Sequence, residues 1–103
     1  MPRIIVLFNL KADADQNAYE DWARNSDLPT VNNLSSVSGF TVHRATGLLG
    51  SDAPSPYQYI EVLDVTSMDG LFADISTDAM KEIAAQFQSF ADNPQFIVTT
   101  DLG

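Results

Sequence analysis

Short apolar runs and helical stripes of apolar residues alternate along the chain, and their order predicts the fold. Residues 4–10 are almost all β-branched or large apolar residues, which is typical of a strand covered on both faces. Residues 40–45 and 57–65 alternate between two faces as strands do. Residues 96–100 have the composition of a last strand. The pattern therefore predicts four strands.

Apolar positions at helical spacing fill the two long intervals between these strands. In the first interval Asp13 is the expected N-cap of a helix of about three turns. Residues 27–29, Asp-Leu-Pro, are expected to break this helix, because the residue before a proline disfavours the helical conformation. In the second interval two helices are expected, capped by Thr66 or Ser67 and by Thr77.

The order β-α-β-β-α-β predicts an α+β fold of the ferredoxin-like type, with a four-stranded antiparallel sheet and helices on one face. A chain of 103 residues is expected to form one domain, residues 1–103. One sheet face is left without a cover, although the strands carry apolar residues on both faces. We therefore expect a homodimer in which a second copy covers the open face. The alternative is a monomer whose open face tolerates some apolar residues.

The chain carries 14 acidic and 5 basic residues, a formal net charge of −9. This charge repels phosphate backbones and anionic lipids, so we expect neither a nucleic-acid partner nor a membrane partner. With no cysteine and one histidine, we expect no metal site. A glycine-rich phosphate-binding motif is missing, and no apolar run approaches the roughly 20 residues that span a bilayer. We expect a cytoplasmic protein without a cofactor.

The single histidine provides a first hypothesis for chemistry. If the second and third strands form a hairpin centred near residues 52–53, His43 falls roughly opposite Glu61 or Tyr59 on the same sheet face. A carboxylate beside an imidazole raises its pKa and fixes its tautomer, which creates a general acid–base unit. Glu61 would orient His43, which would carry the proton. The alternative is a cross-strand polar pair with a structural role only.

A second group of candidates lies around the end of the first helix. Tyr19 and Trp22 are three residues apart and share a helix face, and Asp27 stands beside the proline that follows. Aromatic walls beside a carboxylate describe a pocket for a flat organic molecule, to which Tyr59 and a polar anchor, Asn9, would contribute. Core packing, a helix cap and a turn are the structural alternatives for these residues. Further aromatic residues that line such a pocket or belong to the core are Tyr57, Phe72 and Phe87.

Six segments spread over nearly the whole chain are shared with a known family. They are 18–23 (AYEDWA), 27–32 (DLPTVN), 40–42 (FTV), 46–49 (TGLL), 59–61 (YIE) and 90–94 (FADNP). With these segments the chain resembles the REDY-like family of HapK type. The resemblance implies the dimeric α+β barrel fold and a place in pathways that make prodigiosin-type pyrrole pigments and related indole-derived metabolites.

The wider superfamily implied by this resemblance includes cofactor-independent monooxygenases, haem-degrading enzymes, isomerases and polyketide cyclases. In several of these relatives a histidine stands in a His-x-Pro setting after the first helix. This chain has Asp27-Leu28-Pro29 there, so the histidine chemistry of those relatives does not carry over to this position. Asp27 becomes the candidate acid or base by its position.

Taken together, these features favour a small cofactor-independent enzyme of secondary metabolism. It would bind an aromatic heterocyclic intermediate, of pyrrole or indole type, and promote its cyclisation or tautomerisation by proton transfer. Asp27 and His43 are expected to transfer protons, and Glu61 to orient His43. The alternatives are a non-catalytic protein that binds and delivers a pathway intermediate, and a cofactorless monooxygenase.

Overall fold

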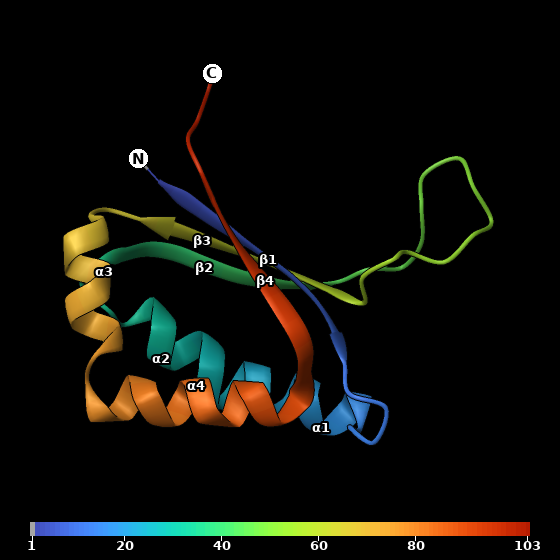
Figure 1. The fold of residues 1–103 in the computed structure, drawn as a ribbon, viewed down its shortest axis with the longest axis horizontal. Helices are drawn as coiled ribbons and strands as arrows, with labels where there is room; N and C mark the ends of the chain where they lie inside the picture. The colour runs from blue at the N-terminus through green and yellow to red at the C-terminus, as the bar shows by residue number, and fades with distance from the viewer. Residues whose placement is uncertain (1) are drawn as a thin grey trace.

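The computed structural model describes residues 2–103 as an antiparallel sheet with helices on one face (Figure 1). The strands are β1 (Arg3–Leu10), β2 (Val37–Arg44), β3 (Tyr59–Val65) and β4 (Ala91–Thr99). The helices are α1 (Gln16–Trp22), the π-helical turn η1 (Ala23–Asp27), α2 (Leu28–Asn32), α3 (Met68–Ile75) and α4 (Asp78–Phe90). The strand order is β2-β3-β1-β4, with β2 and β4 at the edges. The predicted ferredoxin-like α+β fold is confirmed.

The first helical region differs from the sequence prediction at both ends. Asp15, not Asp13, is the N-cap, because its carboxylate accepts a hydrogen bond from the Ala18 N–H at 3.1 Å. The expected break at residues 27–29 does not occur. The Leu28 N–H donates to the Ala23 carbonyl, so the chain passes through one π-helical turn directly into α2. Pro29 lies in the first turn of α2.

The face of the sheet that the helices cover carries the core. Four aromatic rings meet there, from β1, α1, β3 and α4: Phe8 lies 5.6 Å from Tyr19, 5.5 Å from Tyr59 and 5.0 Å from Phe87, measured between ring centroids. The first and third of these contacts are edge-to-face, which the aromatic quadrupole favours. This aromatic cluster anchors α1 and α4 to the sheet.

The strand register decides which residues share the covered face. Across β2 and β3 the partners are Val42 with Glu61 and Arg44 with Tyr59, while His43 lies opposite Ile60. Directly opposed residues point to the same side of an antiparallel pair. Glu61 and Tyr59 therefore face the helices, and His43 faces the open side.

The segment between β2 and β3 forms the arm that projects from the body of the protein in Figure 1. Asn9 fixes the root of this arm: its amide donates to the Pro56 carbonyl at 3.1 Å and accepts from the Gln58 N–H at 2.9 Å. Among residues 2–103, no helix has the length and apolar character needed to cross a bilayer.

Candidate functional site

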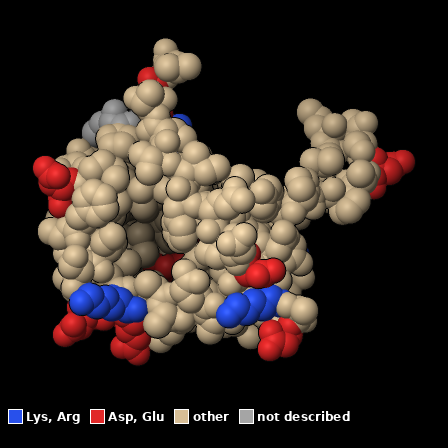
Figure 2. All heavy atoms as spheres, viewed as in Figure 1, with Lys and Arg blue, Asp and Glu red and all other residues tan. Residues whose placement is uncertain are grey.

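An apolar cavity of about 480 Å³ lies between the covered face of the sheet and helices α2, α3 and α4. Its volume is within the range of small-molecule sites in proteins. Three lining side chains, Phe72, Phe96 and Val98, are also more than half exposed and mark the mouth. Figure 2 shows this hollow opening at the surface, with acidic atoms in its depth. The cavity therefore has the size, the apolar walls and the access of a ligand site.

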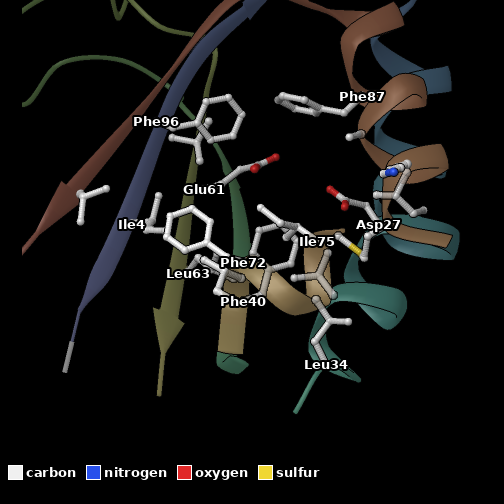
Figure 3. A pocket seen from close by; sticks show the side chains of 18 of the residues that line it. Ile4, Asp27, Leu34, Phe40, Glu61, Leu63, Phe72, Ile75, Phe87 and Phe96 are labelled. Carbon is white, nitrogen blue, oxygen red and sulfur yellow. The ribbon is translucent and has the colours of Figure 1, made fainter. Parts of the chain in front are cut away.

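Two carboxyl groups, those of Asp27 and Glu61, interrupt the apolar lining. They come from opposite walls, Asp27 from the helical layer and Glu61 from β3, and point toward one another across the cavity (Figure 3). The exposed fraction is 4% for Asp27 and 5% for Glu61. Carboxyl groups are rarely buried to this degree without a charged partner.

The π-helical turn places Asp27 in the cavity. A π turn contains an additional residue and rotates the side chains that follow it relative to a regular helix. Asp27 is the last residue of η1 and is buried, whereas its neighbours Arg24 and Asn25 are exposed. Glu61 reaches the cavity for a simpler reason, because it alternates with Ile60 and Val62 along β3 and shares the covered face with Leu63.

Burial raises the pKa of both carboxyl groups. The pKa of Asp27 rises to about 7, because the apolar surroundings disfavour its charged form. The pKa of Glu61 rises to about 8, through burial first and through the nearby negative charge of Asp27 second. Near neutral pH the two groups therefore retain a proton between them. Such a pair contains both an acid and a base.

Tyr19 supports Glu61 from behind the cavity wall. Its hydroxyl donates to Glu61 Oε2 at 3.3 Å, and this hydrogen bond opposes part of the rise in the Glu61 pKa. Tyr19 itself is completely buried, and its own pKa is raised by burial and by the carboxyl groups beside it. It belongs to the core and does not line the cavity, which corresponds to the structural alternative for this residue.

Three other candidate residues also lie outside the cavity, where they contact other parts of the fold. Trp22 packs against α4, where its indole N–H donates to Gln86 Oε1 at 2.6 Å. Tyr59 is buried, and its hydroxyl donates to Glu20 Oε2 at 2.6 Å. Asn9 holds the root of the arm, as described above. None of the three lines the apolar cavity.

The predicted contact between His43 and Glu61 is wrong. The predicted register placed His43 opposite Glu61 or Tyr59, whereas the observed partner is Ile60, which lies between them. A shift of one residue moves a side chain to the other sheet face. The ring of His43 is exposed, and its Nε2 lies 2.9 Å from Thr41 Oγ1.

A second, shallower hollow brings together some of the residues that the sequence singled out. It has a volume of about 380 Å³ and lies between η1 and the edge strand β2. Tyr19, His43 and Tyr59 border it together with Glu20 and Arg44. Because Tyr19 and Tyr59 are almost fully buried, they present little surface to this hollow. Its charged groups are already paired with one another, Arg44 with Glu20 at 3.4 Å.

From the sequence, most of the residues that line the apolar cavity were either assigned to the core or not singled out. Phe72 and Phe87 were candidates and do line it. The alternation of apolar residues along the strands contained the signal for Ile4, Val6 and Leu63, which share the face of Glu61. Nothing in the sequence pattern indicated Lys81, a lining residue from α4. Among residues 2–103, no three His, Asp or Glu side chains cluster closely enough to hold a metal ion.

These features define a class of protein, a ferredoxin-like α+β fold with an acidic pair inside an apolar cavity. The family model described as REDY-like protein HapK matches residues 2–102. The chain belongs to this family.

Solved structures of other proteins show the same architecture. HapK from Hahella chejuensis is 33% identical, with a TM-score of 0.81 over 100% of this chain and 94% of that one. SnoaB, a cofactor-independent oxygenase from Streptomyces nogalater, is 11% identical, with a TM-score of 0.76 over 99% and 93%. A dimeric ferredoxin-like protein from Thermobifida fusca is 17% identical, with a TM-score of 0.73 over 97% and 90%. At these low identities, the similarity to the last two structures shows only that they share the fold. Among curated proteins, the sequence search finds no match.

Proposed function

We propose that this protein is a small cofactor-independent enzyme of secondary-metabolite biosynthesis. It binds an aromatic heterocyclic intermediate, of the pyrrole or indole type that its family resemblance implies, in the apolar cavity. There it promotes cyclisation or tautomerisation by proton transfer. The observation that carries the proposal is the pair of carboxyl groups, Asp27 and Glu61, which face one another across apolar walls.

The two carboxyl groups have different assigned roles because their environments differ. Asp27, with the lower pKa of about 7, is the base that accepts a proton from the ligand. Glu61, with a pKa of about 8, remains protonated at neutral pH and donates a proton at a second position. A tautomerisation needs these two transfers and no other reagent. The apolar walls exclude water and align the ligand between the groups.

The test measures turnover of the pathway intermediate by the variants Asp27→Asn and Glu61→Gln. Each substitution preserves shape and removes the titrating group, so we expect a loss of about 10²- to 10⁴-fold in kcat. Glu20→Gln is the matched control, because Glu20 is a hydrogen-bonded carboxylate outside the cavity. Undiminished turnover by both cavity variants contradicts the proposal. Saturable binding at one equivalent without turnover by the wild-type protein would instead indicate a binding and delivery protein.

We further infer that two copies pair through the open face of the sheet. Apolar side chains form a continuous patch on this face, since Ile5 lies beside Val62 and Ile97, and Leu7 lies beside Ile60. Ile97 is 42% exposed within one copy. A patch of this kind on the uncovered face of a sheet is typical of an interface.

Light scattering after size-exclusion chromatography tests the dimer. The wild-type protein is expected at the mass of two 11.2 kDa chains. Ile97→Lys places a charge in the patch and is expected to give the monomer mass. Ala85→Lys, on the exposed side of α4, is the control and is expected to remain a dimer. A wild-type protein that elutes as a monomer at micromolar concentration contradicts this inference.

A further inference from the structure

The acidic pair in the cavity has no cationic partner within residues 2–103. The ion pairs in this part of the chain join Arg3, Arg24 and Arg44 to other carboxylates, and none includes Asp27 or Glu61. Lys81 lines the cavity but lies beyond ion-pair distance of both carboxyl groups. A buried carboxylate without a counter-charge is costly, and a bound cation would remove that cost.

The hydrogen-bonding capacity of the pair is also largely unused. Among the described side chains, Asp27 accepts no hydrogen bond, and Glu61 accepts one, from Tyr19. Among residues 2–103, no fully buried side-chain oxygen lacks a hydrogen-bond partner, so the unbonded oxygens of Asp27 are not sealed in the core, and they point into the cavity (Figure 3). Each carboxylate can accept several hydrogen bonds. The cavity therefore offers acceptors and a negative charge to a ligand that brings N–H donors.

The surroundings of the pair favour a flat cation. Phe40, Phe72, Phe87 and Phe96 line the cavity and present aromatic surfaces, which attract cations as well as rings. The formal net charge of −9 also raises the concentration of cations near the protein as a whole. Of the described residues that line the cavity, Lys81 alone opposes a cation, and its side chain is exposed to solvent.

We infer that the cavity selects aromatic ligands that bear a protonated nitrogen over neutral or anionic ligands of the same shape. The bound N–H groups donate to oxygens of Asp27 and Glu61, Asp27 completes its ionisation by giving a proton to the buffer, Glu61 keeps its proton, and the ligand keeps its own. This inference rests on the proposed function, because the same cavity holds the ligand, and it requires the pyrrole- or indole-type intermediate to carry a basic nitrogen, such as an amine or imine, outside that ring. It concerns charge selection during binding and is tested without turnover.

Three bicyclic probes of similar shape test the selection. At pH 7.5, 4-aminoquinoline is a cation, 4-methylquinoline is neutral and quinoline-4-carboxylate is an anion. Titration calorimetry is expected to show at least tenfold tighter binding of the cation than of the neutral probe, and no measurable binding of the anion. In two buffers of different ionisation enthalpy, the heats are expected to show proton release with the cation.

The pH dependence separates charge selection from simple apolar binding. Between pH 6.5 and 8, where 4-methylquinoline is neutral throughout, the affinity for 4-aminoquinoline is expected to rise, because the carboxyl groups that lose their protons become better partners. The affinity for 4-methylquinoline is expected to fall over the same interval, because a neutral ring buries the ionised pair further. The other titratable groups around the pair are Tyr19 from α1 and Lys81 from α4.

Variants locate the selection in the pair. The double variant Asp27→Asn with Glu61→Gln is expected to bind the cation and the neutral probe equally, with Glu20→Gln keeping the wild-type preference. Circular dichroism establishes that each variant is folded, and the pH series on the wild-type protein needs no variant. Equal affinity of the wild-type protein for all three probes, or preference for the anion, overturns the inference. Charge selection without turnover of any pathway intermediate would instead overturn the proposed catalysis and leave this inference standing.

Discussion

Two tyrosine–carboxylate pairs lie close together in this protein and differ in almost every other respect. Tyr59 donates to Glu20 at 2.6 Å, and Glu20 also meets Arg24 at 3.2 Å and Arg44 at 3.4 Å. Tyr19 donates to Glu61 at 3.3 Å, and no cation accompanies that carboxyl group among the described residues. The negative charge of the carboxylate is thus compensated by arginines in the first pair, and no cation compensates it in the second.

The pKa values of the two carboxyl groups move in opposite directions as a result. The pKa of Glu20 is lowered, first by the hydrogen bond from Tyr59 and further by the two arginines. The pKa of Glu61 is raised to about 8, first by burial. The charge of Glu20 is therefore satisfied within the protein, and this residue has a structural role in joining α1 to the sheet. Glu61 and its neighbour Asp27 are groups whose charge a ligand can still satisfy, and such uncompensated groups are typical of functional sites.

The largest expected effect of this difference is an unusual dependence of stability on pH. Unfolded carboxyl groups ionise near pH 4, whereas Asp27 and Glu61 keep their protons until about pH 7 and 8 in the folded protein. The unfolded state therefore binds fewer protons in this interval, and the free energy of unfolding falls as the pH rises. Asp27 alone accounts for a decrease on the order of 3 kcal/mol between pH 4.5 and 8.

Urea unfolding followed by the fluorescence of Trp22 measures this decrease. Asp27→Asn is the control that isolates its source, since the variant is expected to match the wild-type protein at pH 5 and to exceed its stability at pH 8. If the stability of the wild-type protein rises between pH 5 and 8, the prediction is contradicted. Asp27 and Glu61 would then be stabilised in their charged forms by a partner that is not among the contacts described above. Stability data at several pH values thus test the comparison directly.

The compensated pair should show the next largest effect when its donor is removed. Tyr59→Phe keeps the ring and deletes the hydroxyl that reaches Glu20. We expect a loss of about 1.5 to 3 kcal/mol at pH 7, because the acceptor is ionised and partly buried. The pKa of Glu20, followed by NMR, is expected to rise, since this hydrogen bond is the main cause of its lowering.

Tyr57→Phe is the matched control for this prediction. The Tyr57 hydroxyl has no hydrogen-bond partner among residues 2–103, so its removal is expected to change the stability by less than about 0.5 kcal/mol. If the two phenylalanine variants lose the same stability, the contact between Tyr59 and Glu20 contributes nothing specific.

The uncompensated pair should respond less to the same change. Tyr19→Phe removes a longer hydrogen bond to a carboxyl group that is mostly protonated at neutral pH. We expect a loss of about 1 kcal/mol at pH 6. The pKa of Glu61 is expected to rise further, because the hydrogen bond from Tyr19 lowers it. A loss as large as that of Tyr59→Phe, measured at the same pH, would remove the contrast between the two pairs.

The sequence was sufficient to predict the fold and one member of the acidic pair by its position. Periodicity placed the strands and the main helices, and the Asp-Leu-Pro segment identified Asp27. The π-helical turn was not predictable, because residue propensities do not separate it from a helix break before Pro29. Glu61 was a candidate for a different reason, and its partner was misassigned.

That misassignment has one physical cause. A long connection between two strands does not fix their register, and a one-residue shift exchanges the faces. With the observed register, Val42 rather than His43 lies opposite Glu61. The alternation along β2 was correctly predicted, but the pattern alone could not show whether Val42 or His43 lies opposite Glu61.

The smallest expected effect is therefore that of His43→Ala on the cavity. His43 is exposed on the open face, and its Nε2 contacts Thr41 on its own strand. We expect a change below about 0.5 kcal/mol in stability and less than a twofold change in the affinity for 4-aminoquinoline. A tenfold loss of affinity would mean that His43 reaches the ligand after all. In a dimer formed through the open face, the imidazole of one copy still points away from its own cavity, so the expectation is the same in either state of assembly.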